Sequence, residues 1–174
     1  VRALAGGVTT DKILEMVRRL RGEVSIPLLF MTYANVVFSY GTERFLKAAA
    51  DAGIDGLILP DVPYEEREDF APACQKYGVD YIPLVAPTSR GRVQRIAESA
   101  QGFVYCVSSM GVTGERSSLS GQVSGLVEEV RKFTPVPAAV GFGVSTPRQA
   151  AQVAAAADGV IVGSAIVRLV EQYG

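Results

Sequence analysis

The chain has 174 residues, of which 48% are apolar and 20% are charged, and its formal net charge at pH 7 is −1. This composition is typical of one soluble globular domain with a substantial core, and without a basic run it predicts no nucleic-acid partner. The longest apolar runs have the length of a strand and are interrupted by Pro, Gly or Asp, which excludes a membrane span.

The chain contains no histidine and only two cysteines, Cys74 and Cys106. Without histidine it lacks the commonest metal ligand and the usual acid or base near neutral pH, so we expect neither a metal site nor a Ser-His-Asp triad. Two cysteines are too few for a disulfide framework. We expect both to be buried, reduced side chains in a cytoplasmic protein.

Apolar runs of strand length alternate with segments of helical periodicity along the chain, after a short helix that ends at Gly6-Gly7. The predicted strands are residues 27–31, 56–59, 80–85, 102–107, 136–140 and 159–162. The predicted helices are one from Thr10, with Thr10 as its cap, to Gly22, one from Thr42, residues 65–77 and 90–100, one holding Leu126, Val127 and Val130, and one after each of the last two strands.

This strict alternation, with short links, indicates a parallel sheet covered by helices. We predict an α/β fold of the (β/α)8 TIM-barrel family, as a partial barrel of six βα units in a single domain, residues 1–174. A complete barrel needs roughly 250 residues, so we expect about two further units upstream. An open doubly wound sheet is the alternative, but such a sheet generally carries its glycine-rich phosphate loop after the first strand.

Two glycine turns follow the last two predicted strands, Gly141-Phe142-Gly143 and Gly163-Ser164. Backbone N–H groups at a helix N-terminus are unpaired and favour an anion, and glycine lets the backbone approach that anion closely. Paired turns after the last two strands are where a TIM barrel binds phosphate. Two ordinary tight turns are the alternative.

The acidic residues fall into two groups. Asp55, Asp80 and Asp158 precede or begin predicted strands and should be structural, because the working face of such a fold lies at the strand C-termini. Asp61 follows a strand. It is either a general base or a side chain that holds its Pro-flanked turn or caps the helix that comes next.

Residues 111–121 form a glycine- and serine-rich link that is long for this fold, and we expect a lid over the substrate. In the strand before it, Phe103, Tyr105 and Val107 alternate to one face. Tyr105 then presents its hydroxyl to a ligand, or it is a core tyrosine.

Several segments together resemble the alpha subunit of tryptophan synthase, across essentially the full length of the chain. They are residues 31–35, 59–66, 103–105 with 108–114, 141–145 and 162–167. The resemblance implies a lyase of tryptophan biosynthesis that cleaves indole-3-glycerol phosphate to indole and glyceraldehyde 3-phosphate by a retro-aldol reaction. It further implies no metal or organic cofactor, and a beta subunit that receives the indole.

The resemblance also assigns residues by motif. The substrate-phosphate set is Gly114, Phe142, Gly143, Gly163 and Ser164. The substrate-pocket set is Phe30, Ile58 and Tyr105, and the set facing the beta subunit is Asn35, Asp61 and Pro63. Thr113, in the lid, is implied to support a catalytic aspartate when the loop closes.

The family's catalytic glutamate and aspartate lie in motifs resembling Glu-Leu-Gly-x-Pro and Ser-Asp-Pro-x-x-Asp-Gly-Pro, neither of which occurs here. We therefore expect both acids upstream, and little or no cleavage by these 174 residues alone. Phe103 also replaces a tyrosine frequent in relatives.

Two other functions stay open from the residues alone. One is a different phosphate-binding TIM-barrel enzyme, such as a sugar-phosphate isomerase with Asp61 as base. The other is a non-catalytic assembly module that keeps the phosphate site.

Overall fold

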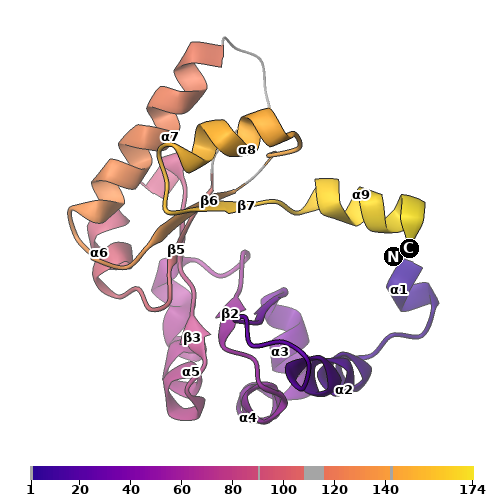
Figure 1. Ribbon diagram of the computed structural model, residues 1–174. Helices are drawn as coiled ribbons and strands as arrows, with labels where there is room; N and C mark the ends of the chain where they lie inside the picture. Colours follow the sequence, from indigo (N-terminus) through magenta and orange to yellow (C-terminus); the bar gives the residue numbers. More distant parts are fainter. Residues whose placement is uncertain (1, 90, 108–115, 142) are drawn as a thin grey trace. The chain divides into compact units, whose positions relative to one another are not determined.

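The computed structural model describes residues 2–89, 91–107, 116–141 and 143–174 (Figure 1). The chain divides into two compact units, Val1–Tyr81 (unit 1) and Ile82–Gly174 (unit 2). Each unit has its own sheet, with strand order β1-β2-β3 in unit 1 and β4-β5-β6-β7 in unit 2. All strand pairs in both sheets are parallel, which confirms the α/β prediction.

Unit 1 contains nine elements in the part that the structure describes. They are α1 (Arg2–Ala5), α2 (Thr10–Arg21), β1 (Leu29–Met31), α3 (Ala34–Tyr40), α4 (Thr42–Ala52), β2 (Gly56–Ile58), the 3₁₀-helix η1 (Tyr64–Asp69), α5 (Ala71–Tyr77) and β3 (Asp80–Tyr81). Helices α2 and α4 pack against each other (Figure 1). A buried cluster that includes Leu14, Val37, Leu46 and Phe70 forms the core of this unit.

Local hydrogen bonds explain the limits of the first two long helices. The side chain of Thr9, and not the predicted Thr10, caps α2 by accepting a hydrogen bond from the Lys12 amide (3.3 Å). Helix α4 ends at Gly53, which adopts the left-handed conformation (φ 92°) that a glycine takes without steric cost.

Unit 2 also contains nine elements among its described residues. They are β4 (Leu84–Val85), the 3₁₀-helix η2 (Pro87–Ser89), α6 (Val93–Glu98), β5 (Val104–Val107), α7 (Arg116–Arg131), β6 (Ala138–Gly141), α8 (Pro147–Ala154), β7 (Gly159–Ile161) and α9 (Ser164–Tyr173). Helix α9 continues the chain beyond β7 (Figure 1). No helix within the described residues is long and apolar enough to cross a membrane.

The structure corrects two of the predicted elements. The single strand predicted for residues 80–85 is two strands, β3 and β4, in different sheets. Between them Pro83 has no N–H group to donate, and its carbonyl accepts a hydrogen bond from the Tyr105 amide (2.9 Å). The helix predicted for residues 65–77 divides into η1 and α5, and Pro72 lies in the first turn of α5, where proline is tolerated.

Both cysteines are free and buried, as predicted. Cys74 lies on α5 in unit 1 and Cys106 lies on β5 in unit 2. Burial raises the pKa of each thiol to about 12. Because the thiolate is the reactive form, both side chains are protected chemically as well as sterically.

Each thiol therefore reports on the unit that contains it. We expect neither cysteine to react with iodoacetamide at pH 8 in the native protein, and both to react once the protein unfolds. Mass spectrometry after labelling in graded urea measures the two midpoints separately. Coincident midpoints are expected if the chain is the single domain predicted from the sequence, and rapid labelling of either cysteine without urea contradicts the burial described here.

Candidate functional site

The two faces of the sheet in unit 2 carry different side chains. Val104, Cys106, Ala138 and Val140 are at most 1% exposed and share one face, since Val104 lies opposite Ala138 and Cys106 opposite Val140. Helix α7 packs on these two strands. Tyr105 points to the other face, as alternation along the strand requires.

Tyr105 shares its face with the small residues Ala139, Gly141 and Gly159. Its side chain leans toward the carboxyl end of the sheet. A Cβ added to Gly141 would lie 2.7 Å from the Tyr105 hydroxyl and 2.8 Å from the Cβ of Ile161. Position 141 is therefore glycine because the tyrosine occupies the space that a side chain would need. Tyr105 is 7% exposed, and burial raises its pKa, so it is a neutral phenol at pH 7.

The two glycine turns follow neighbouring strands of this sheet. Gly141, the last residue of β6, lies opposite Ile161, the last residue of β7. Because the strands are parallel, the turns that follow them leave the same edge of the sheet. Gly143, in the first turn, has a positive φ of 80°, a conformation that L side chains rarely adopt.

The helix after the first turn does not present open amides. Thr146 and Gln149 form a capping box: the Thr146 hydroxyl accepts from the Gln149 amide (3.2 Å). The Gln149 side chain accepts from the amides of Thr146 (3.1 Å) and Ser145 (2.9 Å). The capping box therefore satisfies the amides of Ser145, Thr146 and Gln149. The expectation of unpaired amides at both helix starts is wrong for these three amides at the start of α8.

The helix after the second turn is different, because no side chain caps it. The amides of Ile166 (3.0 Å) and Val167 (3.1 Å) both donate to the Gly163 carbonyl. Within the described residues, the amides of Ser164 and Ala165 have no hydrogen-bond acceptor. These donors lie at the positive end of a ten-residue helix, which is the arrangement that binds an anion.

The residues assigned to an apolar pocket in unit 1 lie on opposite faces of its sheet. Phe30 is opposite Leu57 and packs against the buried cluster, with its ring centroid 6.0 Å from that of Phe45 on α4. Ile58, the next residue after Leu57, points the other way. Its face also carries its register partner Met31, with Leu29 and Gly56 one pair further back along the strands. Two-residue alternation in the sequence could have identified Met31.

Asp61 is a hydrogen-bond acceptor for the backbone. Both of its carboxylate oxygens lie 3.1 Å from the amide nitrogen of Ala34, the first residue of α3. This contact favours a structural role for Asp61 over that of general base, although the helix it holds is the preceding one. The contact also brings Asp61 close to Asn35, and the side chains of Asn35, Asp61 and Pro63 are all exposed.

Three of the assigned residues lie outside the described residues: Thr113, Gly114 and Phe142. Residues 111–115 of the expected lid also lie outside them. Helix α7 already includes the rest of that segment, since it begins at Arg116. Among the described residues, no group of three or more His, Cys, Asp or Glu side chains is placed to hold a metal ion.

Parallel strands alternating with helices, with glycine turns after neighbouring strands, define this chain as an α/β protein of the kind that includes TIM barrels. The tryptophan synthase alpha chain family model matches residues 1–174. The chain is 50% identical to the tryptophan synthase alpha chain of Lacticaseibacillus casei over 170 residues, and 51% identical to that of Geobacter sulfurreducens over 173 residues. The chain belongs to the tryptophan synthase alpha chain family.

The alignments cover 98% and 99% of this chain but 64% and 66% of the two relatives, so the chain spans just under two thirds of their length. Among solved structures, tryptophan synthase subunit alpha from Campylobacter jejuni superposes with a TM-score of 0.91 at 36% identity. That match covers 99% of this chain and 69% of the other. The fold class predicted from the sequence is confirmed by this neighbour.

A small substitution tests the contact between Tyr105 and Gly141. We expect Gly141→Ala to lower the free energy of unfolding by about 1–3 kcal/mol, because the new methyl group forces the Tyr105 ring to move. Gly125→Ala is the matched control. Gly125 is exposed on α7 with no atom near its missing Cβ, so alanine there should stabilise by about 0.5–1 kcal/mol. Urea denaturation measures both, and equal midpoints would contradict the packing.

A pair of neighbouring substitutions tests the two faces of β1. We expect Phe30→Ala to destabilise by roughly 1–3 kcal/mol, less than for a fully buried phenylalanine, because its ring packs on the core of unit 1. Met31 is 57% exposed, so Met31→Ala should change stability by no more than about 0.5 kcal/mol. If Met31→Ala is the more damaging change in urea denaturation, the assignment of faces is wrong.

Proposed function

We propose that this chain is the phosphate-binding part of a tryptophan synthase alpha chain, a carbon-carbon lyase that cleaves indole-3-glycerol phosphate to indole and glyceraldehyde 3-phosphate. Family membership across residues 1–174 supports the reaction class. The observation that carries the proposal is the start of α9, where uncapped amides follow the Gly163 turn beside the Gly141–Gly143 turn. A role in tryptophan biosynthesis makes the cytoplasm the expected location.

The proposed reaction breaks the carbon-carbon bond between the indole ring and the glycerol chain. The ring carbon gains a proton, and the hydroxyl on the adjacent glycerol carbon loses one as it becomes the aldehyde. The reaction therefore needs an acid and a base but no electron carrier, and carboxyl groups can serve as both. In this chain, Gly143, Gly163 and Ser164 would hold the phosphate and Tyr105 would border the substrate. We propose no cofactor.

Two apolar side chains in unit 1 fit a pocket for the indole ring. Ile58 and Met31 share the sheet face opposite the helix-packed core. Phe30 was assigned to this pocket by motif, but it packs against that core. We therefore propose Met31, rather than Phe30, as the partner of Ile58.

The partner proposed for this chain is a tryptophan synthase beta subunit. One of the solved neighbours belongs to the tryptophan synthase α2β2 complex of Pyrococcus furiosus; its TM-score is 0.87 at 31% identity. In this chain the exposed residues Asn35, Asp61 and Pro63 are the proposed contact, with Asp61 holding the start of α3 in place. The exposed rings of Tyr33 and Phe38 lie on or beside the same helix and offer apolar area for such a contact.

Titration calorimetry with glycerol 3-phosphate tests the phosphate site. We expect the unmodified chain to bind it, and Ser164→Ala and Gly163→Ala to weaken binding, the latter by about tenfold or more because its Cβ hinders close approach. No atom lies within 4 Å of that Cβ position, so Gly163→Ala should fold normally. Gly125→Ala is the control and should bind like the parent. Equal affinities in all four proteins would contradict the site.

An assay of indole release tests the reaction. The family's catalytic acid motifs do not occur in these residues, and each missing acid or base typically costs about 10²–10⁴ in rate. We expect release from this chain alone to be at least about 10⁴-fold slower than from a full-length tryptophan synthase alpha chain. Turnover at the full-length rate would show that other groups carry the chemistry.

A further inference from the structure

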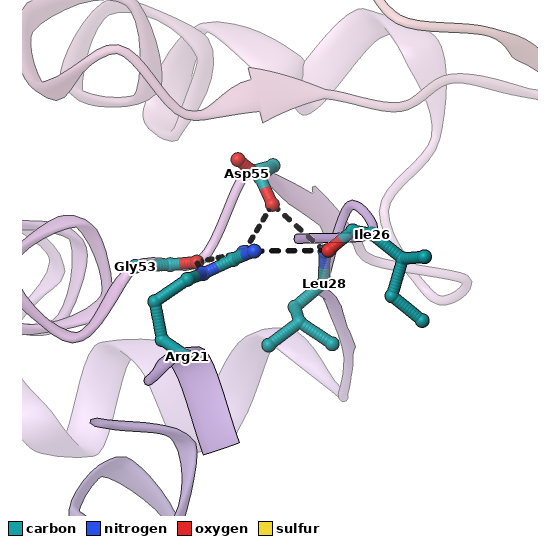
Figure 2. Close-up of polar contacts among 5 residues, drawn as sticks. All are labelled: Arg21, Ile26, Leu28, Gly53 and Asp55. Atoms are coloured by element: carbon teal, nitrogen blue, oxygen red, sulfur yellow. Dashed lines mark hydrogen bonds and ion pairs between the residues drawn. The ribbon is translucent and has the colours of Figure 1, made fainter. Parts of the chain in front are cut away.

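An arginine in each unit lies at the C-terminus of a helix and contacts an aspartate that precedes a strand. In unit 1, Arg21, the last residue of α2, donates to the Asp55 carboxylate (2.5 Å), the Ile26 carbonyl (2.9 Å) and the Gly53 carbonyl (Figure 2). The same Asp55 oxygen accepts from the Leu28 amide (2.8 Å), and the Asp55 amide donates to the Leu28 carbonyl (2.8 Å).

Unit 2 repeats the three central contacts of this arrangement, except that its aspartate uses one oxygen for the arginine and the other for the amide. Arg131, the last residue of α7, donates to Asp158 (2.7 Å). The other Asp158 oxygen accepts from the Ala138 amide (2.9 Å), and the Asp158 amide donates to the Ala138 carbonyl (3.0 Å). In both units the residue whose amide binds the aspartate follows the arginine by seven positions, from 21 to 28 and from 131 to 138; Leu28 directly precedes β1 and Ala138 begins β6.

We propose that Arg131, Ala138 and Asp158 form a three-way tie that sets the register of β6 against β7, as a repeat of the device seen in unit 1. The tie joins three parts of the chain: the end of α7, the start of β6 and the residue before β7, with α8 between the two strands. The Asp158 amide donates to the Ala138 carbonyl, and the Ala138 amide donates to the Asp158 side chain. Both contacts join the same two residues, so a slip by one residue breaks both.

Strands β6 and β7 are short, so the register fixed at their amino ends also fixes which residues pair at their carboxyl ends. Strand β7 has three residues and β6 has four. The pairing Ala139 with Gly159 at one end therefore determines the pairing Gly141 with Ile161 at the other. Those last residues carry the two glycine turns. The tie thus fixes which turn residues face each other, whether or not they bind phosphate.

An exposed ion pair elsewhere shows what distinguishes the tie from ordinary surface charges. Lys47 and Asp51 lie one turn apart on α4 at 2.7 Å, and both side chains are more than half exposed. Neither contacts a strand amide in the described residues. A pair of this kind contributes little to stability, and it serves as the matched control.

Amide hydrogen exchange, followed by NMR on the full chain, tests the tie. We expect Asp158→Ala to speed exchange of the Ala138 amide by roughly 10–100-fold, since its charged acceptor is lost. Asp51→Ala should leave it unchanged. Arg131→Ala should speed it too, but add little in the Asp158→Ala background, because the two side chains act together. An unchanged Ala138 amide in Asp158→Ala, or fully additive effects, overturns the proposal.

A milder variant, Asp158→Asn, keeps the test decisive if Asp158→Ala does not fold. Asp158→Asn retains an acceptor for the Ala138 amide but loses the charge that attracts Arg131. We expect intermediate exchange at Ala138, and a shifted amide resonance at Gly163 that reports altered register at the far end. A Gly163 resonance that stays in place while Ala138 is deprotected overturns the link between the two ends.

The pH dependence gives an independent measurement. The Ala138 amide and the Arg131 guanidinium hold the pKa of Asp158 below its ordinary value. Helix α7 carries Arg131 at the contact, with Glu128 and Glu129 in the same last turn, and α8 carries only Arg148. Strand β5 carries the neutral Cys106 thiol and, on its other face, Tyr105; β6 carries no titratable side chain. A lowered pKa stabilises the fold above the ordinary Asp pKa, and this stabilisation is lost as pH falls through the lowered value. In urea denaturation between about pH 5 and pH 2, the free energy of unfolding should fall less steeply in Asp158→Asn than in the unmodified chain. The same slope of unfolding free energy against pH in both proteins contradicts the tie.

Discussion

Short parallel strands impose the constraint on which this structure depends. The strands among the described residues are two to four residues long, and side chains alternate between the two faces of a sheet. Each strand therefore offers only one or two side chains to a face. In unit 2 the helix-packed face takes Val104, Cys106, Ala138 and Val140, which leaves Tyr105 and a row of small residues for the other. A register shift of one residue would turn the core side chains to the face of the site, and the side chains of the site toward the helices.

The opposite ends of the strands then have separate roles. At the amino ends, carboxylates bind strand amides and arginines, as Asp55 and Asp158 do. At the carboxyl ends, glycine turns follow β6 and β7, and only the second leads into a helix whose first amides are uncapped. This difference between α8 and α9 concentrates the open amide donors for an anion at Ser164 and Ala165. The first turn contributes backbone of unusual conformation at Gly143 and close packing at Gly141.

Much of this organisation could be predicted from the sequence because it follows from local patterns. Apart from α3 and the division of residues 80–85 into β3 and β4, strands and helices follow the predicted order. The structural role predicted for Asp55 and Asp158 is confirmed by their hydrogen bonds. The motifs also identified the family. The phosphate-binding and partner-facing residues remain predictions.

Contacts between distant residues account for what the sequence could not show. Helix α3 was not predicted, since its first amide is held by Asp61, twenty-seven positions away. The separation of β3 from β4 at Pro83 involves the Pro83 carbonyl, which accepts a hydrogen bond from the Tyr105 amide on β5. Phe30 was placed in the pocket by motif alone, whereas its register with Leu57 turns it toward the core.

The most direct test of the account is a ¹H–¹⁵N NMR titration of this chain with glycerol 3-phosphate. If the turns after β6 and β7 bind a phosphate, the amide resonances of Gly143, Gly163, Ser164 and Ala165 should shift together and saturate, while those of Thr146 and Gln149 at the capped start of α8 stay nearly still. Shifts confined to α8, or none near Gly163, would contradict it.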